Sequence, residues 1–409
     1  MNKFHNINYF SLFLESKFRP SAKENLDLVT EALENTNSNK KAPEFRFEPS
    51  EFLPLSSQNS KFSSINLDLN KNISILISGS DDSTLKLWNL DTGKLINSFE
   101  GHQESVNCVE LLPFNRIASG SDDKTIKIWS LENNFDPIDS FQIHDDSVLC
   151  LKYHNETLLS SSADKTVKII DTNNYQLLAS LIGHEDYVEN IELISDNILA
   201  TGSRDNTIRL WNIENIANNI TLHAISVINA HTSNIKVLKR IGENKFISGS
   251  NDGSIKIWQL EGQCEISTIE GYGGCVQSVC CLSDTELVVT YSDHLILIWA
   301  TNRKEPIILD NNAIPSENCL IKINDNKLAC GFMNGFVVIY DLNQNYNRFY
   351  MDGNQGGNIN DLIVVGDEFD RIASASNATI IVFNINDVQQ LNRLEGHIDK
   401  VNCLKYAKI

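Results

Sequence analysis

The sequence predicts an all-β protein made of eight similar units of about 41 residues each. One apolar phrase of about eight residues recurs along the chain, and all the tryptophans take the same place in it. These are Trp88, Trp129, Trp211, Trp258 and Trp299. Three weaker copies place Ile170, Tyr340 and Phe383 there, so that successive copies lie 41, 41, 41, 47, 41, 41 and 43 residues apart. Each copy alternates apolar and polar residues, which is typical of a strand with one buried face.

Further strand signals surround this phrase in each unit. A short apolar segment precedes it, as in "RIASGS" and "KFISGS", and a tight turn that contains aspartate joins the two. Another apolar segment follows the phrase, then a turn that commonly carries histidine, then a segment such as "SVNCVEL". Each unit is therefore expected to form four strands. The 47-residue step contains an insertion within residues 212–231.

This pattern resembles the WD-repeat β-propeller family, in which each repeat forms a four-stranded antiparallel sheet, or blade. The resemblance covers residues 65–409, and the repeat length, the tryptophan and the His-Asp pairing all agree with it. It implies an eight-bladed WD-repeat β-propeller that carries its function on its rims and around its central channel.

The two ends of the repeat region predict how the ring closes. The last residues, "EGHIDKVNCLKYAKI", match "EGHQESVNCVELLPF" but end after one strand, and the first unit begins without Gly-His. The C-terminal strand can therefore complete the N-terminal blade and leave no open strand edge. Residues Ser64–Leu69 stand 41 residues before their counterpart and are the alternative source of this strand. We favour the C-terminal strand because it alone brings a histidine, His397.

The chain divides into an N-terminal extension, residues 1–60, and the predicted propeller, residues 61–409. Ser21 and Glu24 form a capping box ahead of an amphipathic pattern. A short amphipathic helix is therefore expected over residues 21 to 35, followed by a linker. The aromatic residues of the first 18 positions are either a peptide motif for a partner or a strap on the propeller.

Composition narrows the classes of partner. The formal net charge is -19 and the isoelectric point is near 4.9. Such a surface repels phosphate backbones and anionic lipid, so we expect no nucleic acid partner and no membrane insertion, and we favour proteins with basic segments. The nine cysteines include no CxxC pair, and the chain begins with no secretion signal. We therefore expect a reducing, cytoplasmic location, with the nucleus left open.

Histidine, serine and aspartate side chains recur together in a way that resembles a catalytic triad. A catalytic set should occur once, whereas this one returns with the repeat, which indicates structure. In the family the pattern implies a hydrogen-bonded tetrad that links the turns of a blade to its third strand. The four predicted tetrads are His102, Ser119, Asp123 and Trp129; His184, Thr201, Asp205 and Trp211; His231, Ser248, Asp252 and Trp258; and His397, Ser78, Asp82 and Trp88.

The later units lose the tetrad, since Tyr272 and Val289 replace the histidine and the serine before Trp299. One histidine and one aspartate per blade never converge on a shared metal. The sequence also contains no phosphate-cradling glycine loop and no HExxH or GxSxG motif. We therefore expect no catalytic residue, no cofactor, no metal and no small-molecule substrate.

Binding residues are expected on the narrow top of the propeller, at positions that the resemblance implies. Aromatic and arginine side chains dominate binding energetics, so the fourth and fifth blades carry the preferred site. Asp81 and Asp122 add an acidic region over the first two blades, and Asp122 is expected to be available to a partner although Asp123 beside it is buried. The candidate protein-binding residues are Tyr187, Glu189, Arg204, Lys236, Asn251, Asp122 and Asp81.

These features predict a non-catalytic scaffold or adaptor that binds peptide segments or protein surfaces on its top face. The alternatives are a substrate-recognition subunit of a ubiquitin ligase or a similar multi-subunit enzyme, with the N-terminal helix as its docking element, and a bacterial effector that mimics a eukaryotic scaffold. The sequence contains no F-box, which makes the ligase-subunit alternative less favoured than the scaffold.

Overall fold

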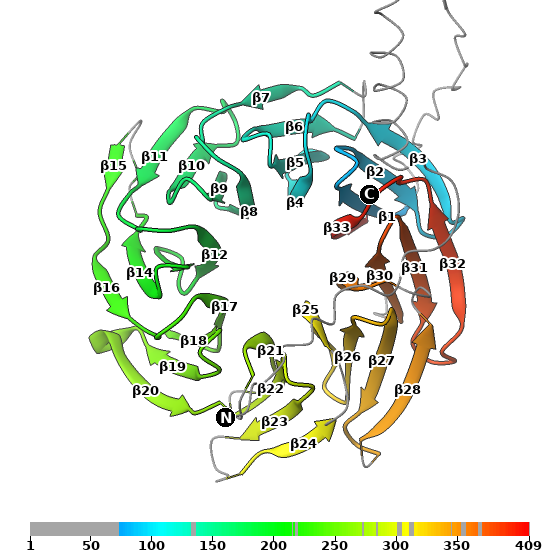
Figure 1. Ribbon diagram of the computed structural model, residues 1–409. Coiled ribbons are helices and arrows are strands. Elements are labelled where there is room, and N and C mark those ends of the chain that lie inside the picture. Colours follow the sequence, from blue (N-terminus) through cyan, green and yellow to red (C-terminus); the bar gives the residue numbers. More distant parts are fainter. Residues whose placement is uncertain are drawn as a thin grey trace, which may run out of the picture. The chain divides into compact units, whose positions relative to one another are not determined.

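Eight antiparallel sheets, or blades, follow one another around a common axis (Figure 1). The computed structural model describes residues 73–408 apart from 132–135, 215, 217–219, 272–273, 284, 301–304, 311–314, 345, 353–356 and 367–369. The side chains of residues 263–264 and 316–318 are also outside the description. All the described residues belong to one unit, Ser64–Ile409. The predicted helix over residues 21–35, the segment Ser64–Leu69 and Tyr272 lie outside the described residues.

The first four blades contain the strands up to β16. Blade 1 consists of β1 (Ser74–Ser80), β2 (Leu85–Asn89), β3 (Lys94–Phe99) and β33 (Val401–Lys408). Blade 2 consists of β4 (Val106–Leu112), β5 (Arg116–Ser121), β6 (Ile126–Ser130) and β7 (Asp139–Phe141). Blade 3 consists of β8 (Val148–His154), β9 (Thr157–Ser162), β10 (Val167–Asp171), β11 (Leu177–Leu181) and the added β15 (Ile220–Leu222). Blade 4 consists of β12 (Val188–Leu193), β13 (Ile198–Ser203), β14 (Thr207–Asn212) and β16 (Ser226–Asn229).

The last four blades each use four consecutive strands. Blade 5 consists of β17 (Ile235–Arg240), β18 (Lys245–Ser250), β19 (Ile255–Gln259), the 3-10 helix η2 (Glu261–Gln263) and β20 (Cys264–Ile269). Blade 6 consists of β21 (Val276–Cys281), β22 (Glu286–Tyr291), β23 (Ile296–Ala300) and β24 (Ile307–Asp310). Blade 7 consists of β25 (Pro315–Asn324), β26 (Lys327–Phe332), β27 (Phe336–Asp341) and β28 (Asn347–Asp352). Blade 8 consists of β29 (Ile359–Val365), β30 (Arg371–Ser376), β31 (Thr379–Asn384) and β32 (Gln390–Glu395).

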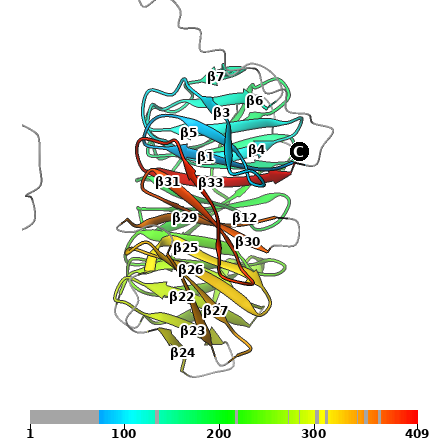
Figure 2. The same cartoon turned by 90° about the vertical axis from the view of Figure 1, so that its right-hand side faces the viewer.

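The C-terminal strand closes the ring, as predicted. β33 pairs antiparallel with β1, and Leu76 lies opposite Tyr406 while Ser78 lies opposite Leu404. Figure 2 shows the red β33 alongside the blue β1, although more than 300 residues separate them in sequence. The inner strand of blade 1 therefore comes from the end of the chain, and the three outer strands come from its beginning.

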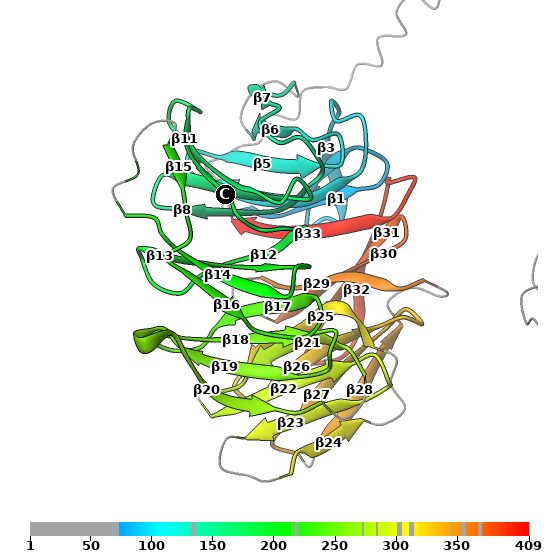
Figure 3. The ribbon, with the colours of Figure 1, turned by 60° about the vertical axis from the view of Figure 1, so that its left-hand side comes forward.

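The insertion inferred from the 47-residue step forms a strand of its own. β15 pairs in parallel with β11, the outer strand of the preceding blade, through Ala179–Ile220 to Leu181–Leu222 (Figure 3). The sheet of blade 3 therefore has five strands, and the outer edge of β11 is covered by a segment that precedes β16 in sequence. An outer edge that would otherwise expose unpaired backbone groups is protected in this way.

The core consists of layers between neighbouring blades. In the layer between blades 1 and 2, Ile77 and Leu87 of one sheet pack with Val106, Ile117 and Trp129 of the next. The second strands are buried on both faces, because each is sandwiched between two other blades, whereas the outer strands are less buried, most clearly in β28 and β32. This accounts for the near-continuous burial of segments such as Arg116–Ser121.

Glycine allows the blades to approach closely next to the axis. A Cβ atom on Gly120 would lie 2.6 Å from Cγ1 of Val148 on the inner strand of the next blade. Gly79 faces Val106 in the same way, at 2.7 Å. The glycine of the recurring "SGS" segment therefore leaves room for a branched side chain of the following blade.

Candidate functional site: the top face and its buried networks

We call the top face the end of the ring that carries the turns between second and third strands and the links from each outer strand to the next inner strand. In blade 2 these are residues 122–125 and 100–105. The opposite end, the bottom face, carries the turns between first and second strands and between third and fourth strands.

A buried hydrogen-bond network joins the two top turns of blade 2 to its third strand. Nδ1 of His102 lies 2.8 Å from Oδ2 of Asp123, and Nε2 of His102 lies 2.7 Å from Oγ of Ser119. The indole Nε1 of Trp129 donates to the same Oγ over 2.8 Å. Thr125, which we did not predict as a member, donates its hydroxyl hydrogen to Oδ1 of Asp123 over 2.6 Å.

The protonation states of Asp123 and His102 follow from these contacts. Burial by itself would raise the pKa of Asp123, but hydrogen bonds from His102, Thr125 and the Gln103 backbone outweigh it and hold that pKa well below its usual range. An ionised carboxylate only accepts, so Nδ1 of His102 carries the hydrogen and Nε2 accepts from the hydroxyl of Ser119. Burial lowers the pKa of His102, because it disfavours the imidazolium. Each side chain of the set is hydrogen-bonded to another member, so the set ties the two top turns of the blade to its third strand.

The structure brings together the other three predicted sets with the same bonds. They are His397, Ser78, Asp82 and Trp88 in blade 1; His184, Thr201, Asp205 and Trp211 in blade 4; and His231, Ser248, Asp252 and Trp258 in blade 5. The blade 1 set joins residues more than 310 positions apart, so it also fastens the ring closure.

Blade 3 contains a fifth set, which the sequence analysis missed. Nδ1 of His144 lies 2.7 Å from Oδ2 of Asp164, and its Nε2 lies 2.8 Å from Oγ of Ser160. Ile170 stands where the other blades have tryptophan and offers no donor. The signal was present in the sequence, because "HDDSV" follows the repeat spacing. A search for tetrads that starts from the tryptophan positions misses this set, because blade 3 has Ile170 in place of tryptophan.

The predicted hot-spot residues of blades 4 and 5 come together on the top face. The guanidinium of Arg204 lies 4.8 Å from the ring centre of Tyr187 and donates from Nε to Glu189 over 2.5 Å. Nζ of Lys236 lies 4.0 Å from the other oxygen of Glu189. The Arg204 side chain is 41% exposed, whereas Glu189 is 16% exposed, so the arginine is held in place and still accessible. Asn251 occupies the same turn position in blade 5, where its N–H donates to Asn234 O over 3.0 Å.

Asp81 and Asp122 are less available than we expected. Asn107 donates to Oδ1 of Asp122 over 2.7 Å, and the same amide donates to the carbonyl of Val148 in the next blade over 3.1 Å. Asn402 links Asp81 and Val106 in the same manner, at 2.6 and 3.1 Å. Both carboxylates are half-buried. Each therefore helps to join its blade to the next, and the expectation of an unengaged Asp122 is corrected accordingly.

Comparison with protein-family models identifies the repeat. The model described as WD domain, G-beta repeat, matches residues 56–89, 93–130, 135–171, 175–212 and 223–259. The chain belongs to the WD-repeat family. Propellers of this family generally bind other proteins, and their fold is generally non-catalytic.

Several curated WD-repeat relatives match parts of the chain. Mitochondrial division protein 1 of Schizosaccharomyces pombe is 42% identical over 80 residues, which is 19% of this chain and 12% of that protein. Nuclear distribution protein PAC1 of Arthroderma otae is 30% identical over 155 residues, which is 34% of this chain and 33% of that protein. Cell division control protein 4 of Saccharomyces cerevisiae is 32% identical over 173 residues, which is 36% of this chain and 22% of that protein. The match therefore spans a third or less of each of these relatives.

Among solved structures, the crystal structure of the computationally designed Ika8 protein aligns with a TM-score of 0.63. It is 24% identical, and the alignment covers 74% of this chain and 90% of that protein. This likeness supports the fold alone.

The WD-repeat pattern weakens in the later blades, and a different network replaces it in blade 7. Tyr340 stands in the tryptophan position, and its hydroxyl donates to Oδ2 of Asp310, on the outer strand of blade 6, over 3.3 Å. Arg348 of β28 lies 2.9 Å from the same oxygen. This network could not be predicted from the repeat, because Asp310 and Arg348 do not recur with it.

Within the described part of the WD-repeat propeller, histidine, cysteine, aspartate and glutamate side chains do not gather in groups of three that could hold a metal. Over the same residues, no helix is long and apolar enough to cross a membrane.

Proposed function

We propose that this propeller is a non-catalytic scaffold that binds a protein segment on its top face, over blades 4 and 5. The observation that carries the proposal is the arrangement of Arg204, which is stacked on Tyr187 and held by Glu189 while it remains exposed. Arginine and tyrosine are among the residues most enriched at binding hot spots, and a fixed side chain loses little entropy when a partner binds.

The acidic surface favours a partner with basic residues beside its contact with Arg204. Glu104 and Asp145 are exposed in the top links of blades 2 and 3, and Glu185 is exposed in that of blade 4. Carboxylates on a rim mainly increase the rate of association and select against partners of like charge. We therefore expect a segment that combines a carboxylate or polar group for Arg204 with lysine or arginine residues that follow it over blades 2 and 3.

Arg204→Glu tests this proposal in quantitative affinity purification from the native cell, read by mass spectrometry. The variant should lose the specific partner while its thermal stability stays nearly unchanged, because an exposed ion pair contributes about 0–1 kcal/mol. Arg393→Glu is the matched control, since Arg393 is a similarly exposed arginine that is also paired with a glutamate at 2.5 Å, on an outer strand.

Partner recovery that is the same for wild type, Arg204→Glu and Arg393→Glu would contradict the proposed site. A parallel purification with residues 1–60 deleted separates the scaffold from the ligase-subunit alternative. If ligase components co-purify with the full chain and disappear on deletion, the extension is the docking element of such an enzyme.

A further inference from the structure

The outer edge of β28 is long and regular. β28 is the last strand of the blade 7 sheet and lies on the outer rim of the ring, in orange in Figure 1. It has six residues and pairs with β27 in an unbroken register, from Phe336–Asp352 to Asp341–Asn347. An edge of this kind offers a continuous row of backbone N–H and C=O groups to another strand.

Among the described strands, each of the other outer ones is short, interrupted or covered. β7, β16 and β24 have only three or four residues. β3, β20 and β32 each contain a break in register where they pair with the third strand of their blade. β11 is covered by β15, which shows that a blade of this propeller accepts a further strand at its outer edge. Short strands and bulges prevent the association of open edges, so β28 is the exception in this ring.

The side chains of β28 alternate between the two faces of its sheet. Arg348, Tyr350 and Asp352 lie on the face toward blade 6, because Arg348 forms an ion pair with the outer strand of that blade. Phe349 and Met351 lie on the face toward blade 8, because Met351 is buried in the layer between blades 7 and 8. Tyr350 is 60% exposed and Phe349 is 37% exposed, so the edge presents an aromatic side chain on each face.

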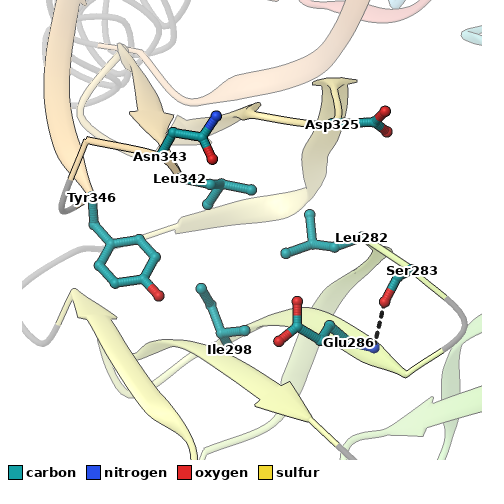
Figure 4. Close-up of a pocket in the computed structure, with 8 residues that line it drawn as sticks. All are labelled: Leu282, Ser283, Glu286, Ile298, Asp325, Leu342, Asn343 and Tyr346. Atoms are coloured by element: carbon teal, nitrogen blue, oxygen red, sulfur yellow. Dashed lines mark hydrogen bonds between the residues drawn. The ribbon is translucent and has the colours of Figure 1, made fainter.

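Contacts on both sides hold β28 in place. Arg348 lies 2.9 Å from Asp310, and Met351 is almost fully buried. Tyr346, directly ahead of the strand, packs with Leu342 against the core between blades 6 and 7, and Figure 4 shows both side chains at the pocket between these blades. An edge that is already ordered loses little conformational entropy when another strand is added, which favours binding.

We propose that the outer edge of β28 binds β28 of a second copy of this chain, in antiparallel orientation. A two-fold axis perpendicular to the sheet relates two identical antiparallel strands, so the residue on the axis lies opposite itself and opposing side chains share a face. With Tyr350 on the axis, Arg348 lies opposite Asp352 of the second copy, and Phe349 lies opposite Met351 of the second copy.

This register makes the strand complementary to itself. An arginine–aspartate pair stands on each side of the tyrosine pair, and a phenylalanine–methionine pair stands on each side on the other face. Aromatic pairs and pairs of opposite charge across neighbouring strands stabilise antiparallel sheets. A register centred on Phe349 places Arg348 opposite Tyr350 and forms no charge pair. A register centred on Arg348 or Asp352 brings like charges together, so the strand favours Tyr350 as the centre.

The net charge of -19 opposes the approach of two copies. Physiological salt screens charges that are more than about 8 Å apart, whereas the opposite charges of the two β28 strands are neighbours across the new edge. The contact consists of one strand from each copy, and small interfaces are typically weak and transient. We therefore expect a reversible dimer at high chain concentration. The outer rim is separate from the top face, so this association is independent of the proposed function.

Sedimentation velocity of the full chain over a wide range of concentration, at physiological salt, tests the proposal. The wild type should shift from monomer to dimer as the concentration rises. Tyr350→Lys and Tyr350→Glu should each remain monomeric, because each places two like charges opposite one another on the two-fold axis. An equimolar mixture of the two variants should form the dimer again, because a lysine then lies opposite a glutamate.

Ile308→Lys is the matched control. Ile308 is 58% exposed and lies opposite Leu297 in blade 6, as Tyr350 lies opposite Val338 in blade 7. Its strand, β24, has four residues and a break in register, so this variant should dimerise as the wild type does. All three variants should unfold at nearly the same temperature as the wild type, because the replaced side chains are exposed, and this measurement shows that they are folded.

Four results would each overturn the proposal. They are a wild type that remains monomeric at every concentration, a Tyr350→Lys variant that dimerises like the wild type, an Ile308→Lys variant that loses the dimer, and a mixture of the two Tyr350 variants that remains monomeric. The first result would leave a strand of another protein as the alternative occupant of this edge.

Discussion

Equivalent serines of different blades have different hydrogen-bonding partners. Ser119 donates to Nε2 of His102 and accepts from the indole of Trp129. Ser160 contacts Nε2 of His144 over 2.8 Å and the carbonyl of Lys168 over 3.5 Å, and it accepts from no indole because Ile170 has no donor. A buried polar group that loses its partner costs about 1–3 kcal/mol. The contribution of each serine to stability is therefore set by how many groups depend on it.

Ser119→Ala should destabilise the protein more than Ser160→Ala. The first change leaves the indole of Trp129 and Nε2 of His102 without a partner, and the second leaves only Nε2 of His144. We expect the difference to be about 1 kcal/mol or more in the free energy of unfolding, measured by urea denaturation. Equal losses for the two variants would contradict the role given to the indole bond.

Much of the buried chemistry at the residue scale could be predicted, because it repeats. Four tetrads followed from the spacing of tryptophan, and the position of Arg204 beside Tyr187 followed from the register. The bond from Asn107 to the carbonyl of Val148 could not be predicted, because it depends on the distance to the next blade. The Asp310–Tyr340–Arg348 network could not be predicted either, because it occurs once and has no period.

At the scale of the element, β33 is the strand on which closure depends. It pairs with β1 along Ser74–Ser80, and it is preceded by His397, which completes the tetrad of blade 1. Asp361 of β29 adds a contact from blade 8, since it accepts from the backbone N–H of Leu404 over 2.7 Å. Closure by β33 was predictable from the unfinished last repeat. The parallel pairing of β15 with the preceding blade was not, because a longer spacing shows that residues are inserted and not where they dock.

Deletion of residues 401–409 should open the ring. β1 would lose its inner neighbour and expose an unpaired edge rich in apolar residues, which promotes association between chains. We expect a loss of the cooperative thermal transition and formation of large species in size-exclusion chromatography. Deletion of residues 1–60 is the comparison, and the domain division predicts that it leaves the transition in place. A monomeric, cooperatively folded product of the C-terminal deletion would show that β33 is dispensable.

At the scale of the whole molecule, stability is distributed over layers between blades, and the titrating groups within those layers act in opposite directions. Burial lowers the pKa of His102, His184 and His231, so these side chains are neutral in the folded protein. Hydrogen bonds lower the pKa of Asp252 to about 2 against the effect of burial. The unfolded chain binds protons more readily at all these groups. The contribution of the three histidines is therefore complete above pH 6.5 and is lost as the pH falls below it, whereas that of Asp252 is retained until the pH falls below about 3.8.

The pKa of Asp361 shifts in the opposite direction on folding. Burial raises its pKa to about 6, although the N–H groups of Leu404 and Leu362 and the charge of Lys405 oppose the rise. Its folded pKa exceeds its unfolded pKa, so the stability it contributes is complete below pH 4 and is lost as the pH rises through 6. Asp361→Asn should therefore cost most at pH 4 to 5 and progressively less towards pH 7. Thermal unfolding of both proteins, followed by circular dichroism from pH 4 to 8, measures this. A cost of Asp361→Asn that is constant over this pH range would show that Asp361 has the same pKa in the folded and the unfolded chain. In either case the wild type should lose stability below pH 6.5 through its buried histidines.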